Sequence, residues 1–157
     1  MSEAAVRGGW WLAQASGDTA RARLLWSQGL LAEIPIGIHF DVVRLLSLQL
    51  GQAAVEDLRA AGRRPGPVLL DHVRRHSFWL VAIERGGWGV PEAELLSRRA
   101  GRLPQAIPVP GTGVGRVGGR EWLVEPDGTG LLTRPGDLAV AIRRARAASR
   151  SASGFVP

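Results

Sequence analysis

The spacing of apolar residues along the chain predicts short strands that alternate with amphipathic helices. Two stretches, residues 38–46 and 78–83, are too short for isolated helices and are rich in β-branched and aromatic residues. Glycine, proline or polar residues bound both of them, and this combination is typical of strands. We therefore expect these two stretches to form the centre of the sheet around which the chain folds.

Helical spacing is present in four segments. Residues 4–14 predict a short helix that two internal glycines weaken. Asp18 is placed to cap a second, amphipathic helix, which continues until Pro35 breaks it. Ser47 and Thr133 are placed to cap a third helix and a terminal helix. The terminal helix has a narrow apolar stripe, and Arg143, Arg146 and Arg150 lie on a second face. Its outer side is therefore expected to be basic.

The other apolar pieces are short and are separated by glycine and proline, which predicts strands joined by tight turns. Residues 68–71 and 78–83 predict a hairpin across the basic turn 72–76. Further strands are expected at residues 93–97, 106–109 and 121–125. This order of elements predicts an α+β fold: a largely antiparallel sheet covered by helices on one face, with an N-terminal helical hairpin and a basic C-terminal helix.

The composition is that of a folded domain without thiol chemistry. The chain has 157 residues, enough for one domain, and no cysteine, which excludes thiol catalysis and thiolate metal sites. With three histidines, a multi-histidine metal site is not expected, and we predict no cofactor. No apolar run has the length of a transmembrane helix and the N-terminus lacks the order of a secretory signal, so we expect a cytoplasmic protein that binds no membrane.

We expect three parts in the chain: an N-terminal helical extension at 1–36, an α+β domain at 37–148 and a flexible tail at 149–157. Positive charge is concentrated toward the end of the chain. All 20 basic residues are arginine. Residues 134–157 contain five arginines against one acidic residue, whereas residues 1–133 contain fifteen against thirteen. Most of the excess positive charge therefore lies at the end of the chain.

Arginines in turns and on an exposed helix are candidates for phosphate contacts, because each neutralised phosphate adds a salt-sensitive increment to affinity. The candidates are Arg63, Arg64, Arg74, Arg75, Arg116, Arg120, Arg143, Arg146 and Arg150. A solvated surface in an arginine-rich protein predicts much the same pattern and remains the alternative. The glycine-rich segment 111–119 is expected to be a hairpin connection, with an anion contact through Arg116 and Arg120 as its alternative.

Aromatic residues supply a second candidate surface. The chain has six tryptophans and no tyrosine, and Trp79 and Trp122 lie in apolar strands where core positions are expected. An exposed apolar face on the N-terminal helices is a candidate interface for a partner protein or a second copy. Its residues would be Trp10, Trp11, Trp26 and Leu30. A core role is the alternative for each of them.

Asp41, Asp71 and His76 form a third candidate site, for nucleotide binding or nucleotidyl transfer. Carboxylates and an imidazole serve such chemistry when they meet around a substrate or a metal ion. The sequence supplies neither a clear nucleophile nor a third acidic ligand. Local hydrogen bonding is therefore the favoured role of these residues, and no catalytic residue is assigned.

An ordered series of short motifs resembles a known family. The motifs are Asp41-Val42-Val43-Arg44, Gly66-Pro67-Val68, Trp79-Leu80-Val81, Trp88, Pro108-Val109-Pro110, Trp122-Leu123-Val124-Glu125-Pro126 and Leu132-Thr133. Over about residues 39–142 they resemble compact actinobacterial proteins grouped with the bifunctional DNA primase/polymerase N-terminal (prim-pol) domains.

The resemblance implies that residues 37–148 form an α+β prim-pol-like domain, but it does not imply catalysis. Catalytic members of the superfamily that includes prim-pol domains use a pair of acidic residues on one strand, a separate histidine and a further aspartate to hold metal ions and the nucleotide. Here Asp41 has no acidic partner two residues away, Glu84 is a lone acid, and no Ser-x-His motif is present. The chain therefore resembles a degenerate, metal-free relative.

The leading hypothesis is a non-catalytic module that binds nucleic acid or an acidic partner through its arginine-rich surfaces. The alternative is an interaction or assembly subunit, with a protein partner or a second copy docked on the N-terminal helical face. A residual nucleotide-binding or nucleotidyltransferase activity ranks third.

Overall fold

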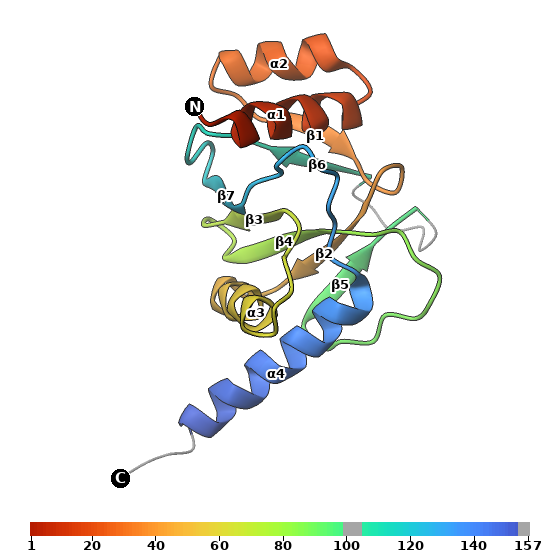
Figure 1. The fold of residues 1–157 in the computed structure, drawn as a ribbon, viewed down its shortest axis with the longest axis vertical. Coiled ribbons are helices and arrows are strands. Elements are labelled where there is room, and N and C mark those ends of the chain that lie inside the picture. The colour runs from red at the N-terminus through yellow and green to blue at the C-terminus, as the bar shows by residue number, and fades with distance from the viewer. Residues whose placement is uncertain (99–104, 154–157) are drawn as a thin grey trace.

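The structure, a computed structural model, describes residues 1–98 and 105–153 (Figure 1). Within these residues the elements are α1 (Glu3–Ala15), α2 (Thr19–Ser27), β1 (Ala32–Pro35), β2 (Asp41–Leu45), α3 (Leu48–Ala60), β3 (Val68–Asp71), β4 (His76–Val81), β5 (Ala93–Leu96), β6 (Ala106–Val109), β7 (Arg120–Val124) and α4 (Pro135–Ser153). The fold is α+β with two antiparallel sheets, which confirms the predicted class. No helix in the described part of the chain is both long and apolar enough to cross a membrane.

The larger sheet has five strands in the order β5-β2-β4-β3-β7, and each neighbouring pair is antiparallel. The smaller sheet pairs β1 with β6. β2 and β4 lie at the centre of the larger sheet, and β3 and β4 form the hairpin that the sequence predicts. The central strands and the hairpin were therefore predicted correctly.

Alternation along β2 directs its side chains into two separate cores. Val43 and Leu45 pack with Trp79 of β4 in a core that α3 and α4 cover. Phe40 and Val42 face the opposite way, into a core closed by the small sheet and α1. Figure 1 shows these layers stacked between α2 at one end and α4 at the other. Helices α3 and α4 thus cover one face of the larger sheet, as predicted, while β1, β6 and α1 cover the other.

The second helix is shorter than the sequence predicts. It ends at Ser27, and the residues expected to continue it form β1 instead. Gly29 has a φ of +71°, a left-handed conformation that turns the chain out of the helix. Beyond this turn, Ala32 and Ile34 are buried and Glu33 is exposed, which is the two-residue period of a strand. The first 36 residues are therefore not wholly helical.

Gly8 of α1, expected to weaken that helix, is a point of close approach. A Cβ atom at this position would lie 1.8 Å from the carbonyl oxygen of Pro126, in the loop after β7. On the same helix the carbonyl oxygen of Ala5 accepts a hydrogen bond from the hydroxyl of Thr112, in the loop after β6. Helix α1 is thus joined to two loops of the larger part of the chain, and the predicted division at residue 36 stays a prediction.

The start of α4 differs in detail from the prediction. The helix begins at Pro135, so the residue directly before it is Arg134 and not Thr133. The hydroxyl of Thr133 accepts a hydrogen bond of 2.9 Å from the backbone N–H of Gly66, which joins the turn after α3 to the segment before α4. The helix continues to Ser153, into the segment expected to be a flexible tail, and residues 154–157 lie outside the described residues.

The glycine-rich segment 111–119 is not a hairpin connection. Strand β6, before it, pairs with β1, whereas β7, after it, pairs with β3. The segment therefore leads from the small sheet to the large one. Gly118 and Gly119 have φ values of +57° and +78°, conformations that glycine adopts without steric cost.

Candidate nucleic-acid interface

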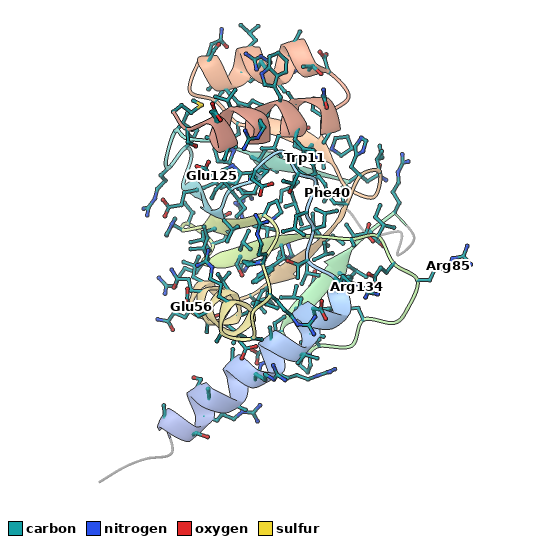
Figure 2. The ribbon with its side chains drawn as sticks, viewed as in Figure 1. Trp11, Phe40, Glu56, Arg85, Glu125 and Arg134 are labelled. Carbon is teal, nitrogen blue, oxygen red and sulfur yellow. The ribbon has the colours of Figure 1, made fainter. Side chains whose placement is uncertain are left out.

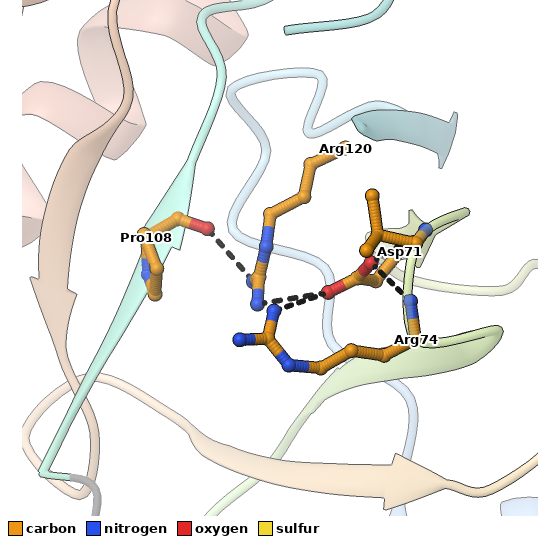
Figure 3. Close-up of polar contacts among 5 residues, drawn as sticks. Asp71, Arg74, Pro108 and Arg120 are labelled. Carbon is orange, nitrogen blue, oxygen red and sulfur yellow. Dashed lines mark hydrogen bonds and ion pairs between the residues drawn. The ribbon is translucent and has the colours of Figure 1, made fainter. Parts of the chain in front are cut away.

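Two of the candidate arginines hold a buried carboxylate. Oδ2 of Asp71, at the end of β3, lies 3.2 Å from a guanidinium nitrogen of Arg120 and 3.2 Å from one of Arg74 (Figure 3). Its Oδ1 accepts hydrogen bonds of 3.0 Å from the backbone N–H groups of Val73 and Arg74. Arg120 also donates a 3.0 Å hydrogen bond to the carbonyl oxygen of Pro108 on β6. The cluster therefore links β3, β7 and the small sheet.

Burial and charge act in opposite directions on this cluster. Burial raises the pKa of Asp71, but the hydrogen bond from the Arg74 N–H and the charge of Arg120 outweigh it, so the pKa lies below its ordinary value. Burial also lowers the pKa of Arg120, which Asp71 partly offsets. The side chain of Arg120 is only 10% exposed and is engaged with Asp71 and Pro108. Arg120 therefore serves the fold and presents little surface to a phosphate.

The neighbouring side chains converge on a second carboxylate. Glu121 of β7 lies 2.5 Å from Nε2 of His72 and 3.3 Å from the guanidinium of Arg116. The hydrogen bond with His72, followed by that with Arg116, lowers the pKa of Glu121. Arg75 of the same turn is exposed and forms no ion pair within the described residues. Most of the positive charge around this turn is thus matched by acids.

The arginines that follow α3 are also paired. Arg63 lies 2.7 Å from Asp137 of α4, and Arg64 lies 3.0 Å from Asp127. Both line a cleft of about 440 Å³ whose lining also includes Asp127 and Glu125. Because arginines and acidic residues line it together, this cleft does not present a uniformly positive surface.

The arginines of α4 divide into two sets. Arg146 is 17% exposed, donates a hydrogen bond to the carbonyl oxygen of Pro91 and lies 3.3 Å from Glu92. Arg143 and Arg150 are exposed and have no ion-pair partner within the described part of the chain. Arg75 is the other exposed arginine of the candidate set without an ion pair in the described residues, so the feature that distinguishes α4 is that it carries two such arginines.

The C-terminal half of α4 stands clear of the rest of the fold. All side chains at 147–152 are exposed, and Figure 1 shows the helix continuing past α3. Residues 143–152 include four arginines and no acidic residue. One of these, Arg144, lies 3.9 Å from Asp57 of α3, at the limit of an ion pair. This half of α4 is therefore a basic helix that other molecules can reach from several sides.

The three residues of the third candidate site do not come together, because Asp41 lies apart from Asp71 and His76. Asp41 is opposite Val81 at one end of the β2–β4 pair, whereas His76 is opposite Asp71 at the other end of β4. Asp41 also lies on the face of Val43, which packs toward α3 and α4. His76 alternates onto the face of the small sheet. Within the described residues, no group of three or more acidic or histidine side chains is arranged to hold a metal ion.

His76 has a distinct electrostatic setting. Burial lowers its pKa, and the charge of Arg44 lowers it further. Its Nδ1 atom is buried and has no hydrogen-bond partner in the described chain. The imidazole is therefore favoured in its neutral form.

The predicted aromatic face is divided between surface and core. Trp10 is 44% exposed and Leu30 49%. Trp11 instead faces Phe40, with ring centroids 6.2 Å apart (Figure 2). The indole N–H of Trp26 donates a 3.0 Å hydrogen bond to the carbonyl oxygen of Val109. The four residues thus do not form one continuous docking face.

Two arginines outside the candidate set take part in these surfaces. Arg144 belongs to the basic half of α4, and Arg23 lies over the ring of Trp10, 3.6 Å from its centroid. Helical spacing contained a signal for Arg23, because it precedes Trp26 by three residues and so lies on the same side of α2.

Neither a family of proteins, nor a curated protein, nor a solved structure matches this chain. The resemblance to prim-pol domains therefore stays a prediction.

Proposed function

We propose that this protein binds nucleic acid through the C-terminal half of α4. The observation that carries the proposal is the unmatched charge of Arg143 and Arg150, which are exposed on a helix segment with four arginines and no acid. These two residues are seven positions apart, or about two helical turns, so they lie on one side of the helix about 10 Å apart along its axis. That stripe suits successive phosphate contacts.

A solvated helical surface commonly carries both signs of charge, and α3 illustrates this. Its exposed Arg59 lies 3.3 Å from Glu56 of the same helix. The end of α4 lacks such acids, which leaves a positive potential that attracts a polyanion. The comparison with α3 supports a binding surface over a merely solvated one.

The shape of this segment also supports nucleic acid as the ligand. The major groove of B-form DNA admits an α-helix, and beyond Arg146 every described side chain of α4 is exposed. The body of the protein therefore does not block an approach along the groove or the phosphate backbone. Phosphate contacts of this kind give affinity with little sequence preference.

The test is binding of fluorescently labelled duplex DNA at low salt, measured by anisotropy. The variant R143Q/R150Q should bind about tenfold more weakly, because it loses two charge-assisted contacts to phosphate. The matched control is R21Q/R85Q, which removes the same charge from two exposed arginines that have no ion pair in the described chain. Arg85 points away from the body, far from the end of α4 (Figure 2).

The control variant should bind within about twofold of the unmodified protein, since its arginines lie outside the proposed contact. A flat titration of the unmodified protein would contradict the proposal, and so would equal losses in the two variants. Labelled poly-glutamate serves as a second ligand. If it binds as tightly as DNA, an acidic protein partner replaces nucleic acid as the better account.

A further inference from the structure

A separate pocket lies between the N-terminal helices, away from the basic half of α4. It has a volume of about 290 Å³ and opens between α1, α2 and the loop after β6. Most of its wall is apolar: Val6 and Trp10 come from α1, Trp26 comes from α2, and Val114 comes from the loop. This volume is close to the lower end, about 300 Å³, of pockets that hold small molecules.

The polar groups of the pocket are mostly occupied within the protein. The hydroxyls of Ser27 and Thr112 and the indole N–H of Trp26 all donate hydrogen bonds to backbone carbonyl oxygens. Arg23 is the exception. Its guanidinium rests on the Trp10 ring, and within the described residues it has no carboxylate partner.

The lining of the pocket includes no acidic residue. A ligand that fits must therefore offer an apolar group to the tryptophans and an acceptor to the single arginine. A guanidinium forms its strongest hydrogen bonds with a carboxylate or a phosphate. One arginine matches the single charge of a carboxylate better than the double charge of a phosphate monoester.

We propose that this pocket binds a small organic acid, with a flat or branched apolar group against Trp10 and Trp26 and its carboxylate paired with Arg23. The walls are already positioned for such a ligand. Trp26 is fixed by its hydrogen bond to Val109, and a Cβ atom at Gly111 would lie only 3.1 Å from the Trp26 side chain. The backbone at Gly111 thus approaches the indole closely and supports it.

The test uses phenylacetate as the acid and phenylacetamide as its uncharged match, followed through the indole N–H signals in NMR spectra. Phenylacetate should shift the signals of Trp10 and Trp26 saturably, with a dissociation constant of about 1 to 5 mM, as expected for a ligand of this size. Phenylacetamide should bind about fivefold more weakly or worse, because it offers no charge to Arg23.

Two variants separate the arginine from the apolar walls. R23Q should bind the acid and the amide equally. Arg21 is a neighbouring exposed arginine that does not line the pocket, so R21Q should keep the preference for the acid. V114W, which puts a larger side chain in the lining of the pocket, should lose both probes. A melting temperature close to that of the unmodified protein confirms the folding of each variant.

The proposal is overturned if phenylacetate produces no saturable shift at Trp10 and Trp26, or if the unmodified protein binds acid and amide equally. It is also overturned if R23Q keeps the preference for the acid. None of these variants alters α4, so these results and those for DNA binding are independent.

Discussion

The carboxylate of Asp71 on β3 and the guanidinium of Arg120 on β7 lie 3.2 Å apart, and both side chains are almost fully buried. Because Arg120 also donates to Pro108 of β6, the pair joins the two sheets. Figure 3 shows Arg120 extended between these two acceptors. Asp71 also pairs with Arg74, but Arg120 has Asp71 as its carboxylate partner. Removal of Asp71 therefore leaves the charge of Arg120 buried without a counterion, so this ion pair is a sensitive point of the fold.

Replacement of Asp71 by Asn should lower the free energy of unfolding by about 3 kcal/mol, because the charge of Arg120 then has no buried counterion. Urea unfolding at neutral pH measures the loss. The double variant D71N/R120M removes both charges and should recover part of it. A D71N variant with the stability of the unmodified protein would contradict the role assigned to the pair.

The same pair predicts how stability depends on pH. The pKa of Asp71 in the folded protein lies below its ordinary value, and that ordinary value, about 3.9, applies to the unfolded chain. The stability from this carboxylate is therefore fully present above about pH 4 and is lost as the pH falls through the folded pKa. The gap in stability between the unmodified protein and D71N should narrow in acid. A gap that stays constant between about pH 6 and pH 2 would contradict this linkage.

The contact between Gly8 and Pro126 gives a prediction about α1. Gly8→Ala should destabilise the protein by about 3 kcal/mol, because the added Cβ would lie 1.8 Å from a carbonyl oxygen and the helix must move. The matched control is Gly136→Ala in α4, where no atom lies within 4 Å of the added Cβ. That change should be neutral or stabilise by about 0.5 kcal/mol. Equal effects of the two substitutions in thermal or urea unfolding would disprove the close docking of α1.

Local patterns in the sequence predicted much of the fold. The strand β2, the β3–β4 hairpin and helix α3 all appear where apolar spacing and turn residues place them. The pairing of β1 with β6 could not be predicted in this way, because 70 residues lie between the two strands. The role of Gly8 was hidden for a similar reason, since its close neighbour, Pro126, is distant in sequence.

The candidate sites were less predictable than the fold. The sequence gives no reason to separate one candidate arginine from another, but in the structure Arg63 and Arg64 meet carboxylates from distant segments, whereas Arg143 and Arg150 do not. Which charges are matched depends on tertiary contacts. Sequence spacing alone therefore could not separate the exposed, unpaired arginines from those held in ion pairs.

The separation of Asp41 from His76 gives a prediction about nucleotides. Asp41 is opposite Val81, and His76 lies five residues before Val81 on β4, a distance of about 17 Å along the strand. Their side chains also point to opposite faces of the sheet. We therefore expect nucleoside triphosphate with Mg²⁺ or Mn²⁺ to leave the melting temperature unchanged. A nucleotide-dependent rise that D41N and H76Q both abolish would contradict this separation.

The most direct test of the proposed function is the salt dependence of DNA binding. For duplex DNA, the slope of the logarithm of the binding constant against the logarithm of salt concentration is about −0.9 for each phosphate neutralised. R143Q/R150Q should therefore reduce the steepness of this slope by about 1.8, because the proposed interface gives Arg143 and Arg150 one phosphate contact each, while R21Q/R85Q should leave it unchanged. An R143Q/R150Q variant with the slope of the unmodified protein would contradict the account.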